Sequence, residues 1–136
     1  MIEEYSAKHI KEIHQEVKTI AVVGASANSE RDSYKVMESL IKHGYQIFPI
    51  NPYEQGNLIL GQLCYSDLSS IPEKIDMVDV FRVKEALIGV TKEAIQIEAK
   101  VLWTQLGVVH EEASELAKSA GLKVIMNRCP KIELEK

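Results

Sequence analysis

The stretch Thr19-Ile20-Ala21-Val22-Val23-Gly24-Ala25-Ser26 decides the fold, because an unbroken apolar run ends here in a glycine and small residues. A short run rich in β-branched residues is typical of a parallel strand that is covered on both faces. Beyond the polar turn, apolar residues recur at helical spacing from Val36 to Ile41, with Asp32 or Ser33 as the expected helix cap. The sequence therefore opens with a strand, a tight turn and a helix.

The same alternation continues to the end of the chain. Strands are predicted over residues 45–50, 75–81, 100–105 and 122–126, and helices over 3–17, 84–99 and 111–120. The stretch 53–70 is irregular, with one weak strand near 58–60. This pattern predicts an α/β fold with a doubly wound, mostly parallel sheet of five to six strands and helices on both faces. Residues 1–136 are expected to form a single domain, with the helix in residues 1–17 packed on it.

Composition narrows the class of protein. A net charge of −4 argues against a nucleic-acid surface or an anchor to an anionic membrane. No apolar run approaches the ~20 residues that span a bilayer, and the first residues lack the pattern of a signal peptide. The two cysteines, Cys64 and Cys129, lie far apart and are expected to be reduced thiols. We therefore expect a cytoplasmic protein with a small-molecule ligand.

The turn after the first strand is the candidate binding site. Gly24 permits a sharp turn, and the small residues Ala25 and Ser26 let a ligand approach main-chain N–H groups. The helix behind the turn presents free N–H donors and a positive partial charge, which suit a phosphate. The guanidinium of Arg31 could pair with a phosphate in bidentate fashion. Ligands of doubly wound sheets bind beyond the carboxyl ends of the strands, so this turn is where we expect one.

The kind of nucleotide follows from what surrounds this turn. Only one of the three glycines of the G-x-G-x-x-G fingerprint is present, at Gly24. The second strand ends in Asn51-Pro52, where a nicotinamide dinucleotide site normally has an acid for the ribose hydroxyls. A cofactor with a phosphate on this ribose, the 2′-phosphate of NADP or the 3′-phosphate of coenzyme A, would be repelled by such an acid. The missing acid therefore favours NADP or coenzyme A over NAD.

Six blocks in order resemble the stand-alone CoA-binding domain proteins, small relatives of the N-terminal domain of the succinyl-CoA synthetase α subunit. The blocks are Val22–Ser26, Arg31–Tyr34, Asn51-Pro52, Val78–Arg82, Trp103–Gly107 and Asn127–Glu133. The resemblance runs from about Ile10 to Glu133 and implies a Rossmann-like fold with coenzyme A held at the strand tips. Members usually carry Asp where this chain has Asn127, which leaves an acid–base role at that position unsupported.

The resemblance also implies a role for each candidate binding residue. Gly24, Ala25 and Ser26 would hold the diphosphate. Arg31 and Lys35 would neutralise its charge, and Asn51 and Pro52 would flank the adenosine. Phe81 and Arg82 would border the pantetheine, and Gln105, Leu106 and Gly107 would close the floor of the site.

No catalytic set can be assembled from this sequence. Asp76 and Asp79 are three residues apart in one strand and are expected to face opposite sides. Trp103 is expected in the core, and Phe81 suits either the core or a ligand platform. The four histidines, His9, His14, His43 and His110, are expected to be solvated, and none has metal-ligand spacing. The thiol of Cys129 would gain reactivity only if Arg128 and Lys131 lie close to it, and an inert buried cysteine is the simpler interpretation.

Three functions remain open from sequence. A non-catalytic or regulatory protein that binds coenzyme A or an acyl-CoA is favoured. The alternatives are an NAD(P)-binding oxidoreductase or redox sensor, and a protein-interaction module with a vestigial nucleotide cleft. A homodimer is compatible with each of these, since sheet edges or the first helix could pair.

Overall fold

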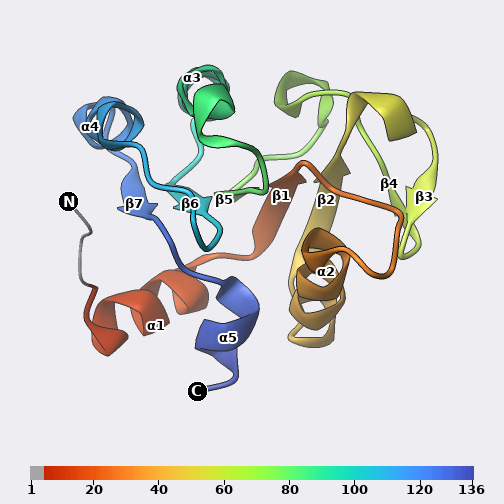
Figure 1. Cartoon of the computed structure of the whole chain (residues 1–136), viewed down its shortest axis with the longest axis horizontal. Helices are drawn as coiled ribbons and strands as arrows, with labels where there is room; N and C mark the ends of the chain where they lie inside the picture. Colours follow the sequence, from red (N-terminus) through yellow and green to blue (C-terminus); the bar gives the residue numbers. More distant parts are fainter. Residues whose placement is uncertain (1–4) are drawn as a thin grey trace.

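The computed structural model describes residues 5–136 and centres on one parallel sheet. Its strands are β1 (Thr19–Val23), β2 (Gln46–Ile50), β5 (Met77–Val80), β6 (Val101–Thr104) and β7 (Lys123–Ile125). They run in the order β2-β1-β5-β6-β7, and every neighbouring pair is parallel (Figure 1). The predicted doubly wound α/β fold is therefore confirmed.

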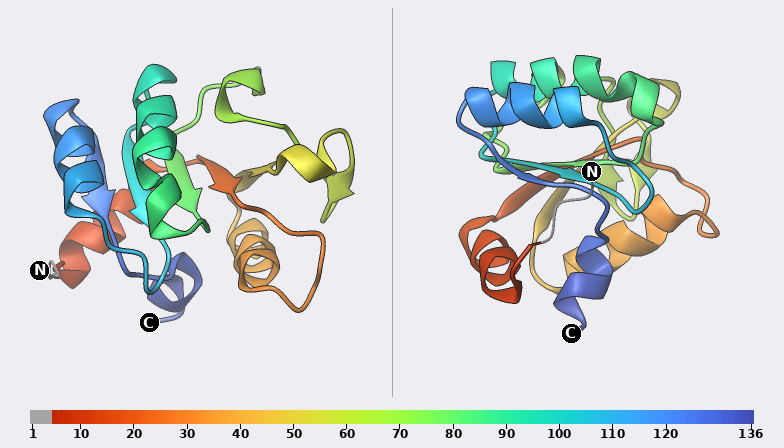
Figure 2. Two further views of the ribbon diagram at one scale, coloured as in Figure 1. Left: turned by 45° about the horizontal axis from the view of Figure 1, so that its top comes forward. Right: turned by 60° about the vertical axis from the view of Figure 1, so that its left-hand side comes forward.

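Helices cover both faces of the sheet. On one face lie α1 (Ala7–Glu16), α2 (Asp32–Lys42) and α5 (Pro130–Leu134), and on the other lie α3 (Leu87–Gln96) and α4 (Glu111–Ser119), as Figure 2 shows from the side. Successive strand residues point to opposite faces, so each strand feeds two cores. In β1, Ile20 and Val22 pack beneath α1 and α2, and Ala21 and Val23 pack against α3 and α4. Burial on both faces explains why the strands read as continuous apolar runs.

Several elements differ from the sequence predictions. The weak strand near 58–60 is β3 (Leu58–Ile59), which pairs only with β4 (Gln62–Leu63) as a separate antiparallel hairpin. The predicted helix 84–99 begins as a 3-10 turn, η3 (Lys84–Ala86), and α3 ends before Glu98, whose φ of 60° is left-handed. The short helix α5 has no counterpart among the predicted elements.

The predicted helix starts also need correction. Asp32 or Ser33 is the expected cap of α2, but Arg31 occupies the cap position and makes no capping bond with its side chain. The first N–H groups of α2 therefore lack a side-chain cap. Residues 3 and 4 of the predicted first helix lie outside the described residues, and α1 begins after Ser6, whose hydroxyl accepts a hydrogen bond from the backbone N–H of His9.

Packing between α1 and the sheet overturns one further expectation. His14 is not solvated but buried, and its ring lies 5.2 Å from that of Trp103. Trp103 is fully buried, as predicted, and donates from Nε1 to the carbonyl oxygen of Arg128 at 2.8 Å. His110 is not free either, because its Nδ1 accepts from the backbone N–H of Ala113 at the start of α4.

Asp76 connects the segments that lead into β1 and β6, at the end of the sheet where the strands begin. Its Oδ2 accepts from the backbone N–H of Lys18 at 2.8 Å, and Lys100 lies 3.6 Å from its Oδ1. Burial alone would raise the pKa of this carboxyl, but these partners together lower it, so it stays ionised.

Within residues 5–136, the helices are too short or too polar to pass through a bilayer.

Candidate functional site

Two adjoining cavities open where β1 and β2 end. The chain leaves β1 for α2 on one face and leaves β5 for α3 on the other, so the sheet reverses its winding between these neighbouring strands (Figure 1). Ligands of open α/β sheets bind at such a point. The wide cavity has a volume of about 550 Å³ and the turn cavity about 390 Å³. Gly24 and Asn51 line both, which joins the two into one candidate site.

Each cavity otherwise draws on its own set of loops and helix ends. The wide cavity is lined by Val23, Gly24, Ile50, Asn51, Pro52, Tyr53, Ser66, Asp67, Leu68, Arg82, Val90 and Glu93. The turn cavity is lined by Gly24, Ala25, Ser26, Arg31, Asp32, Ser33, Asn51 and Phe81.

Gly24 is required by the geometry of the first turn. Its φ is +88°, and a Cβ atom at this position would lie 2.3 Å from the carbonyl oxygen of Phe81. Any other residue would therefore clash with the end of β5 as well as adopt a strained backbone. The turn alone accounts for a glycine here, but the closer constraint comes from Phe81, which directly follows the neighbouring strand β5.

Main-chain amides of the turn are used differently from the expectation. The N–H groups of Gly24 and Ala25 both donate to the carbonyl oxygen of Ile50 at 3.1 Å, so neither is free for a diphosphate. The Oγ of Ser26 accepts from the N–H of Asn28. What the turn offers an anion is therefore the uncapped amino end of α2 and side-chain donors, rather than the amides of Gly24 and Ala25.

Asn51 holds the ends of β1 and β2 together. Its Nδ2 donates to the carbonyl oxygen of Ala25 at 2.8 Å, and its Oδ1 accepts from the N–H of Tyr53 at 2.9 Å. The second bond caps η1 (Pro52–Glu54), the 3-10 turn at the rim of the wide cavity. Asn51 is thus a positioning residue for both cavities, and both of its polar atoms already have partners.

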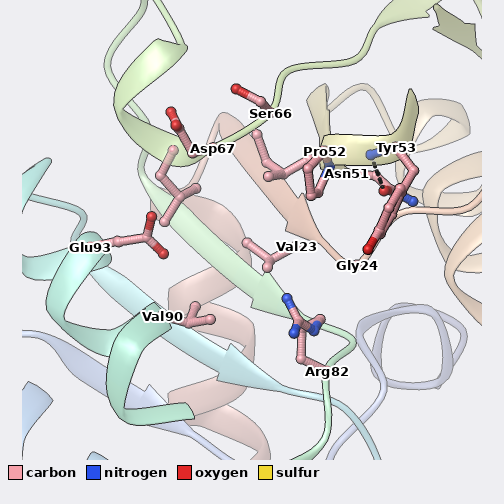
Figure 3. Close-up of a pocket in the computed structure, with 12 residues that line it drawn as sticks. Val23, Gly24, Asn51, Pro52, Tyr53, Ser66, Asp67, Arg82, Val90 and Glu93 are labelled. Atoms are coloured by element: carbon pink, nitrogen blue, oxygen red, sulfur yellow. Dashed lines mark hydrogen bonds between the residues drawn. The ribbon is translucent and has the colours of Figure 1, made fainter. Parts of the chain in front are cut away.

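Two arginines place positive charge at the site from different elements. Arg31 lies at the start of α2 in the turn cavity, and Arg82 follows β5. The Arg82 side chain passes beside Gly24, with its Cδ 3.2 Å from where a Cβ on Gly24 would be. Figure 3 shows its guanidinium pointing into the wide cavity from the side opposite Glu93.

The remaining predicted residues lie outside these two cavities. Lys35 is exposed on α2, and Gln105, Leu106 and Gly107 follow β6. Gln105 has a buried Oε1 without a hydrogen-bond partner among the described residues. The N–H of Gly107 donates to Oδ1 of Asn127 at 2.7 Å, which fixes this loop against the end of β7. Asn127 therefore has a structural contact in place of an acid–base role.

Sequence reasoning missed the two acids of the wide cavity, Asp67 and Glu93, and the exposed ring of Tyr53. Hydrogen bonds from the side chains of Ser70 and Ser69 lower the pKa of Asp67. Partial desolvation raises the pKa of Glu93, and the charge of Asp67 adds to this while that of Arg82 opposes it. No motif marks these acids, because Asp67 lies in an irregular loop and Glu93 lies in the middle of α3.

The two cavities contain no recognisable catalytic set. Neither lining includes a histidine, cysteine or lysine, and within residues 5–136 no group of His, Cys, Asp or Glu has the arrangement of a metal site. Phe81 both lines the turn cavity and packs against the core beneath it. Near buried Cys129, Arg128 stacks over the Tyr5 ring and Lys131 pairs with Glu135. Each of these two cations therefore has a partner other than the thiol.

Comparisons with known proteins identify the family to which the chain belongs. Residues 18–135 match the family described as the CoA binding domain. The chain is 42% identical to YneT of Bacillus subtilis (strain 168) over 127 residues, which covers 93% of each protein. It is 28% identical over 122 residues to the α subunit of an ADP-forming acetate–CoA ligase I of Pyrococcus furiosus, and this match spans 79% of the chain but only 26% of that subunit.

Solved structures show the same fold over nearly the whole chain. A hypothetical protein from Pyrococcus horikoshii OT3 superposes with a TM-score of 0.91 at 40% identity and covers 99% of this chain and 97% of its own. A Thermus thermophilus protein superposes with a TM-score of 0.92 at 30% identity and covers 96% and 98%. From the match to residues 18–135 and these full-length likenesses, we conclude that the chain belongs to the CoA-binding domain family.

Proposed function

We propose that this protein binds coenzyme A, or an acyl-CoA, across the wide and turn cavities and acts as a binding protein without a catalytic step of its own. The observation that carries the proposal is the forced glycine turn. Gly24 packs against Phe81 where the sheet reverses its winding, and cavities open on both sides of it. The diphosphate would lie at this turn, with the adenosine and the pantetheine on either side.

The charged and polar groups suit the parts of such a ligand. Arg31 and the uncapped start of α2 offer donors to the diphosphate, and Arg82 approaches the same turn from β5. Gln105 presents a buried carboxamide oxygen without a partner, among the described residues, near the tip of the adjacent strand. Gln105 lies outside the two cavities, so an amide N–H of the pantetheine arm would satisfy its oxygen only where that arm extends beyond them.

A binding role without catalysis fits the chemistry of the lining residues. The two linings supply hydroxyls, an amide, carboxylates and guanidinium groups, but no nucleophile beside a base. A thioester bound there would meet no activated side chain. We therefore propose that the ligand-bound form of the protein is the functional state and that it acts on a partner.

Calorimetric titration of the full chain tests this proposal. Binding of coenzyme A or acetyl-CoA to one site is expected, with NAD and NADP much weaker. Arg31→Gln should weaken binding by about tenfold, the loss expected for one charge-assisted bond to phosphate. Lys42→Gln, at the other end of α2, is the matched control and should bind as the parent does. If neither coenzyme A nor acetyl-CoA showed saturable binding, the proposal would be refuted.

A further inference from the structure

The wide cavity lies where the nucleoside end of the ligand would rest. It is lined by Asn51, Pro52 and Tyr53, which directly follow β2, and doubly wound sheets hold the ribose at the end of this strand. The Tyr53 side chain is 93% exposed at the mouth of the cavity, so its ring is free to stack on a base. The volume of about 550 Å³ leaves room for a nucleoside.

The charges in this cavity are unevenly placed. Asp67 and Glu93 line the side formed by η2 (Leu68–Ser70) and α3, whereas Arg82 lies beside Gly24 at the turn (Figure 3). The Ser69 hydroxyl and the Ser70 N–H and hydroxyl all donate to the same oxygen of the Asp67 carboxylate, Oδ1. Asp67, Arg82 and Glu93 all line this one cavity, so a ligand bound in it would meet all three side chains.

Two carboxylates and one guanidinium give this cavity a net negative charge at neutral pH. A carboxylate in a nucleotide site accepts hydrogen bonds from ribose hydroxyls, and it repels a phosphate attached to the same ribose. In the sequence, the absence of an acid at the end of β2 favours a ribose that carries a phosphate. In the fold, Asp67 and Glu93 supply acids from other elements, which reverses that expectation.

We propose that the wide cavity selects an adenosine whose ribose hydroxyls are free, so that dephospho-coenzyme A binds in preference to coenzyme A. This inference rests on the proposed function and specifies its ligand. Glu93 and Asp67 accept from the ribose hydroxyls or the amino group of the base, and Arg82 pairs with the diphosphate at the turn. A 3′-phosphate on the ribose would bring a dianion toward Asp67 and Glu93.

Calorimetric titration of the unmodified chain with dephospho-coenzyme A and coenzyme A, at one ionic strength, compares the two ligands directly. Dephospho-coenzyme A is expected to bind at least about tenfold more tightly, which corresponds to ~1.4 kcal/mol. In the double variant Asp67→Asn/Glu93→Gln the ratio should fall toward one, chiefly because coenzyme A binds better. Glu38→Gln, on an exposed position of α2, is the control and should keep the parental ratio.

The alternative outcomes separate this inference from the proposed function. Equal or tighter binding of coenzyme A overturns the inference and leaves the proposed function standing. If coenzyme A binds more tightly and this preference disappears in Arg82→Gln, the Arg82 guanidinium contacts the ribose phosphate. A ratio that the double variant leaves unchanged overturns the role given to the two acids. Failure of both ligands to bind refutes the proposed function itself.

Discussion

Asp79 lies directly beside Trp103 in the sheet, because the two residues are partners in the register of β5 and β6. Both side chains are fully buried, yet neither carboxyl oxygen of Asp79 has a hydrogen-bond partner among the described residues. Burial raises the pKa of this carboxyl well above its usual value of 3.8. Asp79 is the next-to-last residue of β5, on the face covered by α1, α2 and α5, and its surroundings favour the protonated carboxyl.

Asp79 should make the stability of the protein fall as pH rises. The folded state keeps a proton that the unfolded state loses near pH 3.8. The free energy of unfolding therefore decreases as pH rises from there to the raised pKa of the folded state. Within that window the slope contributed by this residue approaches ~1.4 kcal/mol per pH unit. Asp79→Asn should remove this contribution, which urea unfolding between about pH 4 and 8 measures. If the variant and the parent, with Glu38→Gln as control, kept parallel pH profiles, Asp79 would not be protonated in the fold.

His14 should oppose this trend on the acidic side. Burial lowers the pKa of its imidazole below the usual 6.5, with the backbone bond to Ile10 and the charge of Glu133 acting the other way. The stability it contributes is complete above pH 6.5 and is lost as pH falls through the window below that value. His14→Gln should flatten the profile there, whereas His9→Gln on the same helix should not. Equal profiles for the two variants would contradict a neutral buried His14.

Gly24→Ala should cost far more than the same change at Gly44. Both glycines have a left-handed φ, but a Cβ at Gly24 meets the Phe81 carbonyl oxygen at 2.3 Å, whereas one at Gly44 meets nothing within 4 Å. We expect a loss of roughly 1 kcal/mol at Gly44 from the backbone alone, and more than about 3 kcal/mol at Gly24. Chemical denaturation of the two variants gives the difference. Similar losses would mean that the turn moves away from β5 at little cost.

Asn51→Asp should weaken ligand binding more than Asn51→Ala. Aspartate keeps the cap on the N–H of Tyr53 but places an oxygen against the Ala25 carbonyl oxygen and adds a negative charge between the cavities. Alanine loses both bonds, at about 1 kcal/mol each, without adding a charge. We expect Asn51→Ala to lose more of the stability that the cap contributes. We expect Asn51→Asp to lose more of the affinity for coenzyme A. Calorimetry and thermal unfolding, measured on both variants, separate the two effects, and the opposite order of affinities would disprove the charge argument.

The five sheet strands could be predicted because each is a compact apolar run, and burial on both faces leaves little room for polar residues. The short hairpin and α5 could not be predicted in the same way. In β3 and β4 only Ile59 is buried, so the pair carries almost no periodic signal. In α5 a run of five residues is too short for helical periodicity to show. The expected caps of α2, Asp32 and Ser33, are its first two residues instead, because both residue types suit a cap and their order alone does not show where the helix begins.

Part of the candidate site was equally visible in the sequence. The glycine turn and the two arginines follow strands, and the carboxyl ends of parallel strands meet at one edge. Asp67 and Glu93 were not visible, since they belong to an irregular loop and a helix that approach each other only when α3 packs over the sheet. The use of the Gly24 and Ala25 amides by Ile50 was also hidden, because that contact joins two strands.

The sequence by itself determined which segments become strands, which faces they bury and where the chain turns, because apolar spacing and glycine act over a few neighbouring residues. Only the tertiary structure decided which polar groups meet at the strand tips and which of them are already engaged. Hydrogen bonds and charge interactions depend on distances of a few ångströms between residues far apart in the chain, and those distances exist only after the helices have packed on the sheet.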